Sequence, residues 1–150
     1  QPNSENIVEI AQEYPGYTAD NRSINTPVEA GVIPLCDALN SLPGVFTIWS
    51  CEGHPERASR PFVTFVAPKE LAFKVHRAIE ERGQDLGLNF NWWLTANFRD
   101  DGSMQYTIEP NDYRVSKGAW QRWWSSRRWS HRVMLKDLSR LATLVQQGSN

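Results

Sequence analysis

Four of five consecutive residues in the first half of the chain carry groups suited to nucleophilic or acid–base chemistry: Ser50, Cys51, Glu52 and His54, with Gly53 between the last two. A thiol can act as a nucleophile, an imidazole as a base or phosphate donor, and a carboxylate as an acid, a base or an acceptor for a ribose hydroxyl. Gly53 permits a positive φ or the close approach of a ligand. We expect all five to bind a ligand, with Cys51, Glu52 and His54 as catalytic candidates. The alternative is a packed Cys51, a turn at Gly53 and a solvated His54.

Cys51 and His54 are also two residues of metal-ligand type. Structural zinc sites usually combine two close pairs of ligands, and here Cys36, His76 and His131 would each have to come singly from elsewhere. We therefore expect no metal. The two cysteines are expected to be free thiols, since a single bridge is uncommon in a chain of cytosolic character.

A second chemical constellation lies near the C-terminal end, where tryptophans and arginines are interleaved over residues 120–132. Arginine suits phosphate contacts, and tryptophan offers a flat face on which a nucleobase can stack. We expect an anion-binding face made of Arg122, Arg127, Arg128 and Arg132. The alternative is that the tryptophans belong to the core and the arginines pair with acidic groups of the same chain.

The net charge of −1 over 150 residues conceals a strong asymmetry. Residues 1–113 carry 16 acidic and 8 basic side chains, whereas residues 114–150 carry 8 basic side chains and one acidic one. This polarity indicates an anionic partner or a basic helix lying on an acidic body. Phosphate-loop, dinucleotide-binding, zinc-protease and hydrolase motifs are absent from the sequence. No apolar run approaches the roughly 20 residues of a membrane span, so we expect a cytoplasmic protein without a membrane partner.

The elements that must position these groups follow from apolar periodicity and from Gly and Pro punctuation. Helices are predicted at 4–13, 33–42, 68–82 and 116–147, and strands at 45–49, 61–67, 88–98 and 104–108. The order α-α-β-β-α-β-β-α predicts a single α+β domain over residues 1–150, with a mainly antiparallel sheet packed by helices. Trp92 is expected to be buried against the helix at 68–82. Alternation then places Trp93 on the opposite face of the sheet.

Part of the chain resembles a known family. Leu39-Asn40, Phe46-Thr47 and Ser50-Cys51-x-Gly53 are similar to the methyltransferase-like family of tRNA wybutosine synthesis, whose signature is a strand leading into Ser-Ser-Cys-Ser-Gly-Arg. Trp49, Glu52 and His54 replace the first Ser, the third Ser and the Arg. The resemblance covers residues 35–67. It implies a site at this loop. If the protein is an enzyme, the resemblance implies RNA as its substrate and S-adenosylmethionine as its cofactor. With Leu42-Pro43-Gly44 and Pro61-Phe62 added, the string also resembles small phage and prophage proteins.

These observations favour a small protein that binds an anionic nucleotide or RNA, in the manner of a phage-type inhibitor or sequestering protein. An RNA- or nucleotide-modifying enzyme of methyltransferase-like type is the first alternative, and only there would S-adenosylmethionine be a cofactor. The second alternative is a protein-interaction module, with a host protein as its partner.

Overall fold

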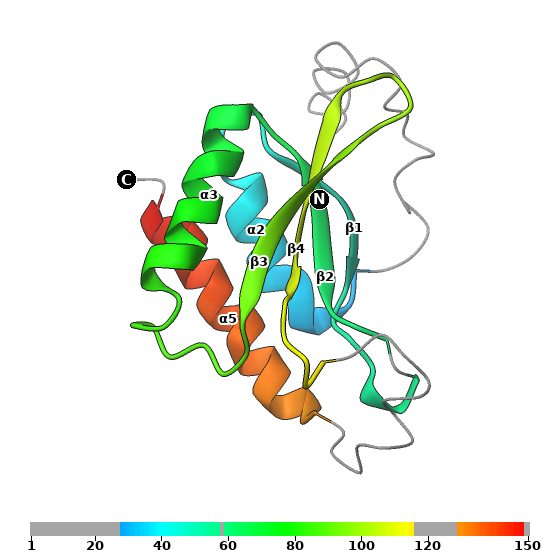
Figure 1. Ribbon diagram of the computed structural model, residues 1–150, viewed down its shortest axis with the longest axis vertical. Helices are drawn as coiled ribbons and strands as arrows, with labels where there is room; N and C mark the ends of the chain where they lie inside the picture. Colours follow the sequence, from blue (N-terminus) through cyan, green and yellow to red (C-terminus); the bar gives the residue numbers. More distant parts are fainter. Residues whose placement is uncertain (1–27, 58, 116–128, 149–150) are drawn as a thin grey trace.

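The computed structural model describes residues 28–57, 59–115 and 129–148 (Figure 1). The expected helix at 4–13 and most of the Trp/Arg segment lie outside these residues. In chain order the elements are the 3-10 helix η2 (Ala30–Val32), α2 (Ile33–Asn40), β1 (Phe46–Cys51), the 3-10 helix η3 (Pro55–Arg57), β2 (Phe62–Val66), α3 (Lys69–Arg82), β3 (Trp92–Phe98), β4 (Met104–Pro110) and α5 (His131–Gly148).

The four strands form one antiparallel sheet in the order β1-β2-β4-β3, and helices α2, α3 and α5 lie together on one side of it (Figure 1). This arrangement confirms the predicted α+β class. β1 and β3 are the edge strands, so side chains on them flank the whole width of the sheet. Among the described helices, none has both the length and the apolar character that a membrane crossing requires.

The main core fills the space between the helices and the sheet. Along α5, Met134, Leu138, Leu141 and Val145 recur at helical spacing and are all buried, which gives this helix one continuous apolar face. Full burial of each such side chain contributes about 1.5–3 kcal/mol. α5 therefore ties the helical layer together through its contacts with α2 and α3.

Element types follow the sequence closely, but several boundaries move. β1 runs two residues further than expected, so Ser50 and Cys51 belong to the strand and not to the loop after it. The strand expected from residue 88 begins only at Trp92. The reason is that the backbone N–H groups of Asn89 and Phe90 donate to the carboxylate of Asp137 on α5 and not to a neighbouring strand.

Trp92 is buried, with 6% of its surface exposed, as predicted. β3 does contact α3, but the indole N–H of Trp92 donates to Asp137 on α5. α5 itself begins at His131, so residues 129 and 130 are not part of the helix expected there.

Candidate functional site

Strand alternation separates Ser50 from Cys51. Residues of β1 point to opposite faces in turn, and Ser50, paired with Val63 of the main core, faces the helices near the thiol of Cys36. Burial raises the pKa of that thiol, and the Ser50 contact partly offsets the rise. Cys51 therefore points to the face of the sheet away from the helices. Both cysteines are free thiols.

Glu29 joins the loop from a distant part of the sequence. Its Oε2 accepts the backbone N–H of Glu52 at 2.9 Å, and its Oε1 lies 2.9 Å from Nε2 of His54. The other ring nitrogen of His54, Nδ1, lies 3.7 Å from Oε1 of Glu56. The imidazole is thus held between two carboxylates.

Cys51 belongs to the same group. Each of Glu29, Cys51 and His54 offers one potential ligand atom, and the three atoms lie within 4.8 Å of one another. The Cys51 Sγ accepts the backbone N–H of Gly53 at 3.3 Å and lies 3.4 Å from Oγ of Ser59. We call Glu29, Cys51 and His54 the corner cluster, because it lies where β1 ends at the corner of the sheet.

Glu52 turns away from this cluster toward η2 and α5. Its Oε2 accepts the backbone N–H of Gly31 at 2.8 Å, while its Oε1 lies 3.4 Å from Nε2 of His131. The His131 ring stacks on His54, with ring centroids 6.3 Å apart. Its Nε2 is buried, and its contact with Glu52 is an ion-pair distance without a hydrogen bond, so this nitrogen has no hydrogen-bond partner among the described residues.

The Trp/Arg segment meets this loop at its C-terminal end. Gly53 has φ of +86°, and a Cβ placed on it would lie 2.8 Å from the ring of Trp129 and 2.9 Å from Pro61. Only glycine permits both this backbone conformation and this approach. The Ser50–His54 loop and the Trp/Arg segment, which lie far apart in the sequence, therefore touch. Trp129 packs against Gly53, and the ring of His131 stacks on that of His54.

Sequence reasoning missed Glu29. The spacing Thr26-Pro27-Val28-Glu29 indicates a helix-capping box, in which the glutamate serves its own helix, yet its carboxylate crosses to residues 52 and 54. Glu29 lies 23 residues before Glu52 in the sequence, so no local pattern links the two residues. Ser59 was missed as well, although its backbone pairs with His54 in both directions.

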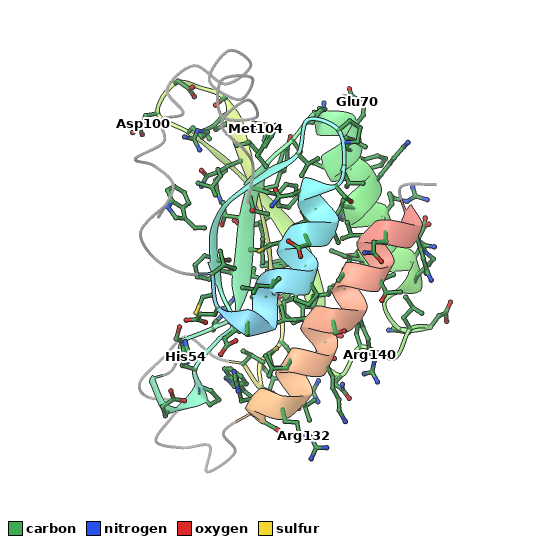
Figure 2. All side chains as sticks on the ribbon, turned by 180° about the vertical axis from the view of Figure 1, so that it is seen from behind. His54, Glu70, Asp100, Met104, Arg132 and Arg140 are labelled. Carbon is green, nitrogen blue, oxygen red and sulfur yellow. The ribbon has the colours of Figure 1, made fainter. Side chains whose placement is uncertain are left out.

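The expected arginine face is described only in part. Arg122, Arg127 and Arg128 lie outside the described residues. Arg132 is exposed at the start of α5, at the same end of the molecule as His54 (Figure 2). Two other basic residues of the C-terminal part are held by the body of the protein: Arg114 binds Asp112, and Arg140 donates to the carbonyl of Gly87.

The face of the sheet away from the helices carries two tryptophans. Trp49 on β1 pairs with Thr64, Thr64 with Thr107, and Thr107 with Thr95 on β3. Directly paired residues share a face, so this row crosses all four strands on one side. Trp93, two residues before Thr95, points the same way. Trp49 and Trp93 keep 40% and 39% of their surface exposed.

This tryptophan face also has a buried part. Phe46, Ile48 and Val66 form a small apolar cluster of their own, separate from the main core. The register of β1 shifts between residues 47 and 49, where Ile48 is the extra residue of a bulge. The bulge re-aims the rest of β1 and so determines that Trp49 and Cys51 face away from the helices.

An open hollow of about 400 Å³ lies at the other end of the helical layer, between α3 and the end of α5. Its lining is basic and partly apolar, and none of the predicted site residues contributes to it; it consists of Phe73, Lys74, Arg77, Ala78, Glu81, Arg82, Gln147 and Gly148. Side chains of Arg77 and Glu81 pair across one helical turn there.

No protein-family model, curated protein or solved structure matches this chain. The resemblance of the Ser50–Gly53 string to the wybutosine methyltransferase-like family therefore stays a prediction.

Proposed function

We propose that the protein binds single-stranded RNA across the face of the sheet that carries Trp49 and Trp93. The observation behind this proposal is the placement of two half-exposed tryptophans on one face, on the two edge strands. Aromatic side chains on a β-sheet are a common platform for the bases of single-stranded RNA, which stack on them. Each stacked base contributes about 1–3 kcal/mol.

The distance between the two tryptophans favours a strand over a free nucleotide. Neighbouring strands lie about 4.8 Å apart, so β1 and β3 are separated by about 14 Å across the sheet. One base can stack on only one of the two rings. A ligand that uses both must therefore carry at least two bases.

The residues between the tryptophans are suited to polar contacts. Hydroxyls of Thr64 and Thr107 lie 2.9 Å apart, and Thr95 continues the row. Thr64 is buried, with 5% of its surface exposed, but Thr95 and Thr107 are partly exposed. Their hydroxyls both donate and accept hydrogen bonds, so these two residues can serve base edges or ribose 2′-hydroxyls. Glu109 on the same face is neutralised by Arg60, whose Nη2 lies 3.3 Å from it.

In this proposal the basic residues of the C-terminal part, 114–150, bind the phosphates of the RNA. Arg132 lies in the first turn of α5, at the same end of the molecule as His54, and Arg122, Arg127 and Arg128 precede it in the sequence. Arginine binds phosphate oxygens in a bidentate manner and tolerates stacking on bases. The positive charge of residues 114–150 then complements the RNA backbone.

The test is a fluorescence-anisotropy titration with a labelled ten-nucleotide single-stranded RNA of mixed sequence. Trp49→Ala and Trp93→Ala should each weaken binding by about 5- to 150-fold, which corresponds to one lost stacked base. Phe98→Ala is the matched control. Its ring is 79% exposed but alternation places it on the helix-facing side of β3, so RNA affinity should stay within twofold.

A mononucleotide should bind at least tenfold more weakly than the ten-nucleotide RNA, because it reaches one tryptophan only. The proposal fails if the wild-type protein does not bind the RNA. It also fails if all three aromatic variants bind it equally well.

A second candidate function is modification of the bound RNA, favoured by the position of Cys51. Its thiol faces the same side of the sheet as Trp49 and lies beside His54. An enzyme of this kind requires Cys51 for turnover and not for binding. With S-adenosylmethionine supplied as the methyl donor, Cys51→Ser should then keep RNA affinity, while mass spectrometry of the RNA shows no methylated nucleotide, which the wild-type protein would produce.

A further inference from the structure

We infer that the corner cluster is a zinc site, with Glu29, Cys51 and His54 as its three protein ligands. A carboxylate, a thiolate and an imidazole are the ligand types that Zn²⁺ takes in proteins. The three residues come from two segments more than 20 positions apart, and the fold brings one ligand atom of each within 4.8 Å of the others. The inference is independent of RNA binding.

The separations suit a tetrahedral ion. With Zn–O and Zn–N bonds of about 2.0–2.2 Å and a Zn–S bond of about 2.3 Å, ligand atoms around one ion lie roughly 3.3–3.6 Å from each other. Oε1 of Glu29 and Nε2 of His54 are 2.9 Å apart and would open by a few tenths of an ångström. All three atoms can reach one ion through side-chain adjustments of about 1 Å.

The surroundings hold each ligand in place. One oxygen of Glu29 is fixed by the backbone N–H of Glu52, which leaves the other oxygen directed at His54. The backbone N–H of Gly53 donates to the Cys51 sulfur at 3.3 Å and so fixes its position in the cluster.

A carboxylate lies close to the second ring nitrogen of His54, where a zinc-bound histidine usually has its outer partner. When Nε2 binds a metal, Nδ1 carries the proton and usually donates it to a carboxylate. Oε1 of Glu56 lies 3.7 Å from Nδ1 of His54, so a movement of less than 1 Å would let it accept that proton. The arrangement Glu56–His54–zinc then orients the ring.

Three protein ligands leave one coordination position for water or for a bound ligand, as in catalytic zinc sites. The nearest further imidazole is His131, which stacks on His54 and whose buried Nε2 has no hydrogen-bond partner among the residues described. His131 lies outside the cluster of mutually close ligand atoms. We therefore assign it to the wall of the open position and not to the ligand set.

The test uses the full chain, freed of metal with a chelator and titrated with Zn²⁺ and Co²⁺. We expect one Zn²⁺ per chain, bound in competition with a chromophoric chelator and with release of protons, because the ligands must deprotonate. Co²⁺ should give the visible bands of a four-coordinate ion together with a sulfur-to-cobalt charge-transfer band. This spectrum tests the site without any variant.

The chain supplies a matched control for every ligand. Cys51→Ser, His54→Ala and Glu29→Gln should each weaken Zn²⁺ binding at least 100-fold, while Cys36→Ser, His76→Ala and Glu81→Gln should leave it within threefold. Glu56→Gln should weaken it about 10-fold, the effect of removing an outer-shell partner. Circular dichroism of each metal-free variant checks that it is folded.

Three results would overturn the inference. The first is a wild-type protein that binds no Zn²⁺ at micromolar concentration. The second is a cobalt spectrum without the sulfur band. The third is a loss of affinity in His131→Ala as large as in His54→Ala, which would replace the proposed ligand set.

Discussion

The indole N–H of Trp92 donates to Oδ2 of Asp137 at 2.9 Å, and both groups are buried. The carboxylate of Asp137 is fully enclosed and accepts three further hydrogen bonds, from the backbone and side-chain nitrogens of Asn89 and from the backbone of Phe90. A buried charge is tolerated only when its hydrogen-bonding capacity is filled in this way. This one side chain of α5 thus determines where β3 begins.

Asp137→Ala should therefore lower the free energy of unfolding by about 3–5 kcal/mol, because several donors buried around it lose their acceptor at about 1–3 kcal/mol each. Urea denaturation followed by circular dichroism measures the change. Asp37→Ala, at an exposed position on α2, should change stability by less than about 0.5 kcal/mol. Equal losses in the two variants would show that the Asp137 network does not stabilise the fold.

Asp112 gives a pH-dependent prediction. Its carboxylate accepts hydrogen bonds from the Arg114 guanidinium and from the backbone N–H of Asn91, and the Arg114 contact lowers its pKa to about 2. Because the pKa is lower in the folded state than the ordinary value near 4, Asp112 stabilises the fold fully above pH 4–5. This stabilisation, about 2 kcal/mol, is lost as the pH falls toward 2.

Asp112→Asn should accordingly be less stable than wild type at pH 7, and the difference should close as the pH falls from 4 to 2. Urea midpoints at pH 7, 4, 3 and 2 measure it. Asp100→Asn, in the exposed hairpin turn, should follow the wild-type profile throughout. A constant difference between wild type and Asp112→Asn over the whole pH range would contradict the assignment.

The fold class was predictable because its signals are local. The alternation of Leu88, Phe90, Trp92 and Leu94 marks a strand, and it correctly divides Trp92 from Trp93. The beginning of that strand was not predictable, since it depends on hydrogen bonds from Asn89 and Phe90 to a residue more than 45 positions away.

The candidate site shows the same limit. The residues from Cys51 to His54 stand out in the sequence because they place reactive side chains at the end of a predicted strand. The bulge at Ile48 and the carboxylate of Glu29 leave no trace in it, yet the first aims Cys51 away from the helices and the second completes the corner cluster. Both arise from pairing between distant segments, which no local pattern encodes.

Two glycines with almost the same backbone form a natural comparison. Gly53 has φ of +86° and Gly102 has φ of +85°, so alanine is strained at both positions. At Gly102 a new Cβ would meet nothing within 4 Å, whereas at Gly53 it would meet Trp129 and Pro61. Gly102→Ala should cost about 1 kcal/mol of stability, and Gly53→Ala at least about 1 kcal/mol more.

Thermal denaturation of the two variants measures that difference. Adding Trp129→Ala to Gly53→Ala should remove part of the extra cost, because it removes the ring that the new methyl group meets, while the contact with Pro61 remains. If Gly53→Ala and Gly102→Ala are equally stable, Trp129 does not pack on the loop in solution.

The basic C-terminal part supplies the last prediction. If Arg127 and Arg128 contact RNA phosphates, each contact releases counterions, and RNA affinity falls steeply as salt rises. Replacing both arginines with Gln should then reduce the slope of log affinity against log salt by about two units, roughly one per lost contact. The control is Arg77→Gln with Arg82→Gln, an equal change of charge on α3, which should leave the slope unchanged. Anisotropy titrations at two salt concentrations measure all three proteins.

If Arg127 and Arg128 instead pair with acidic groups of the same chain, as Arg114 does with Asp112, the first double variant changes stability by no more than about 1 kcal/mol. Its RNA titration curves would then superimpose on those of the wild type at both salt concentrations, and the anion-binding role of this segment would be wrong.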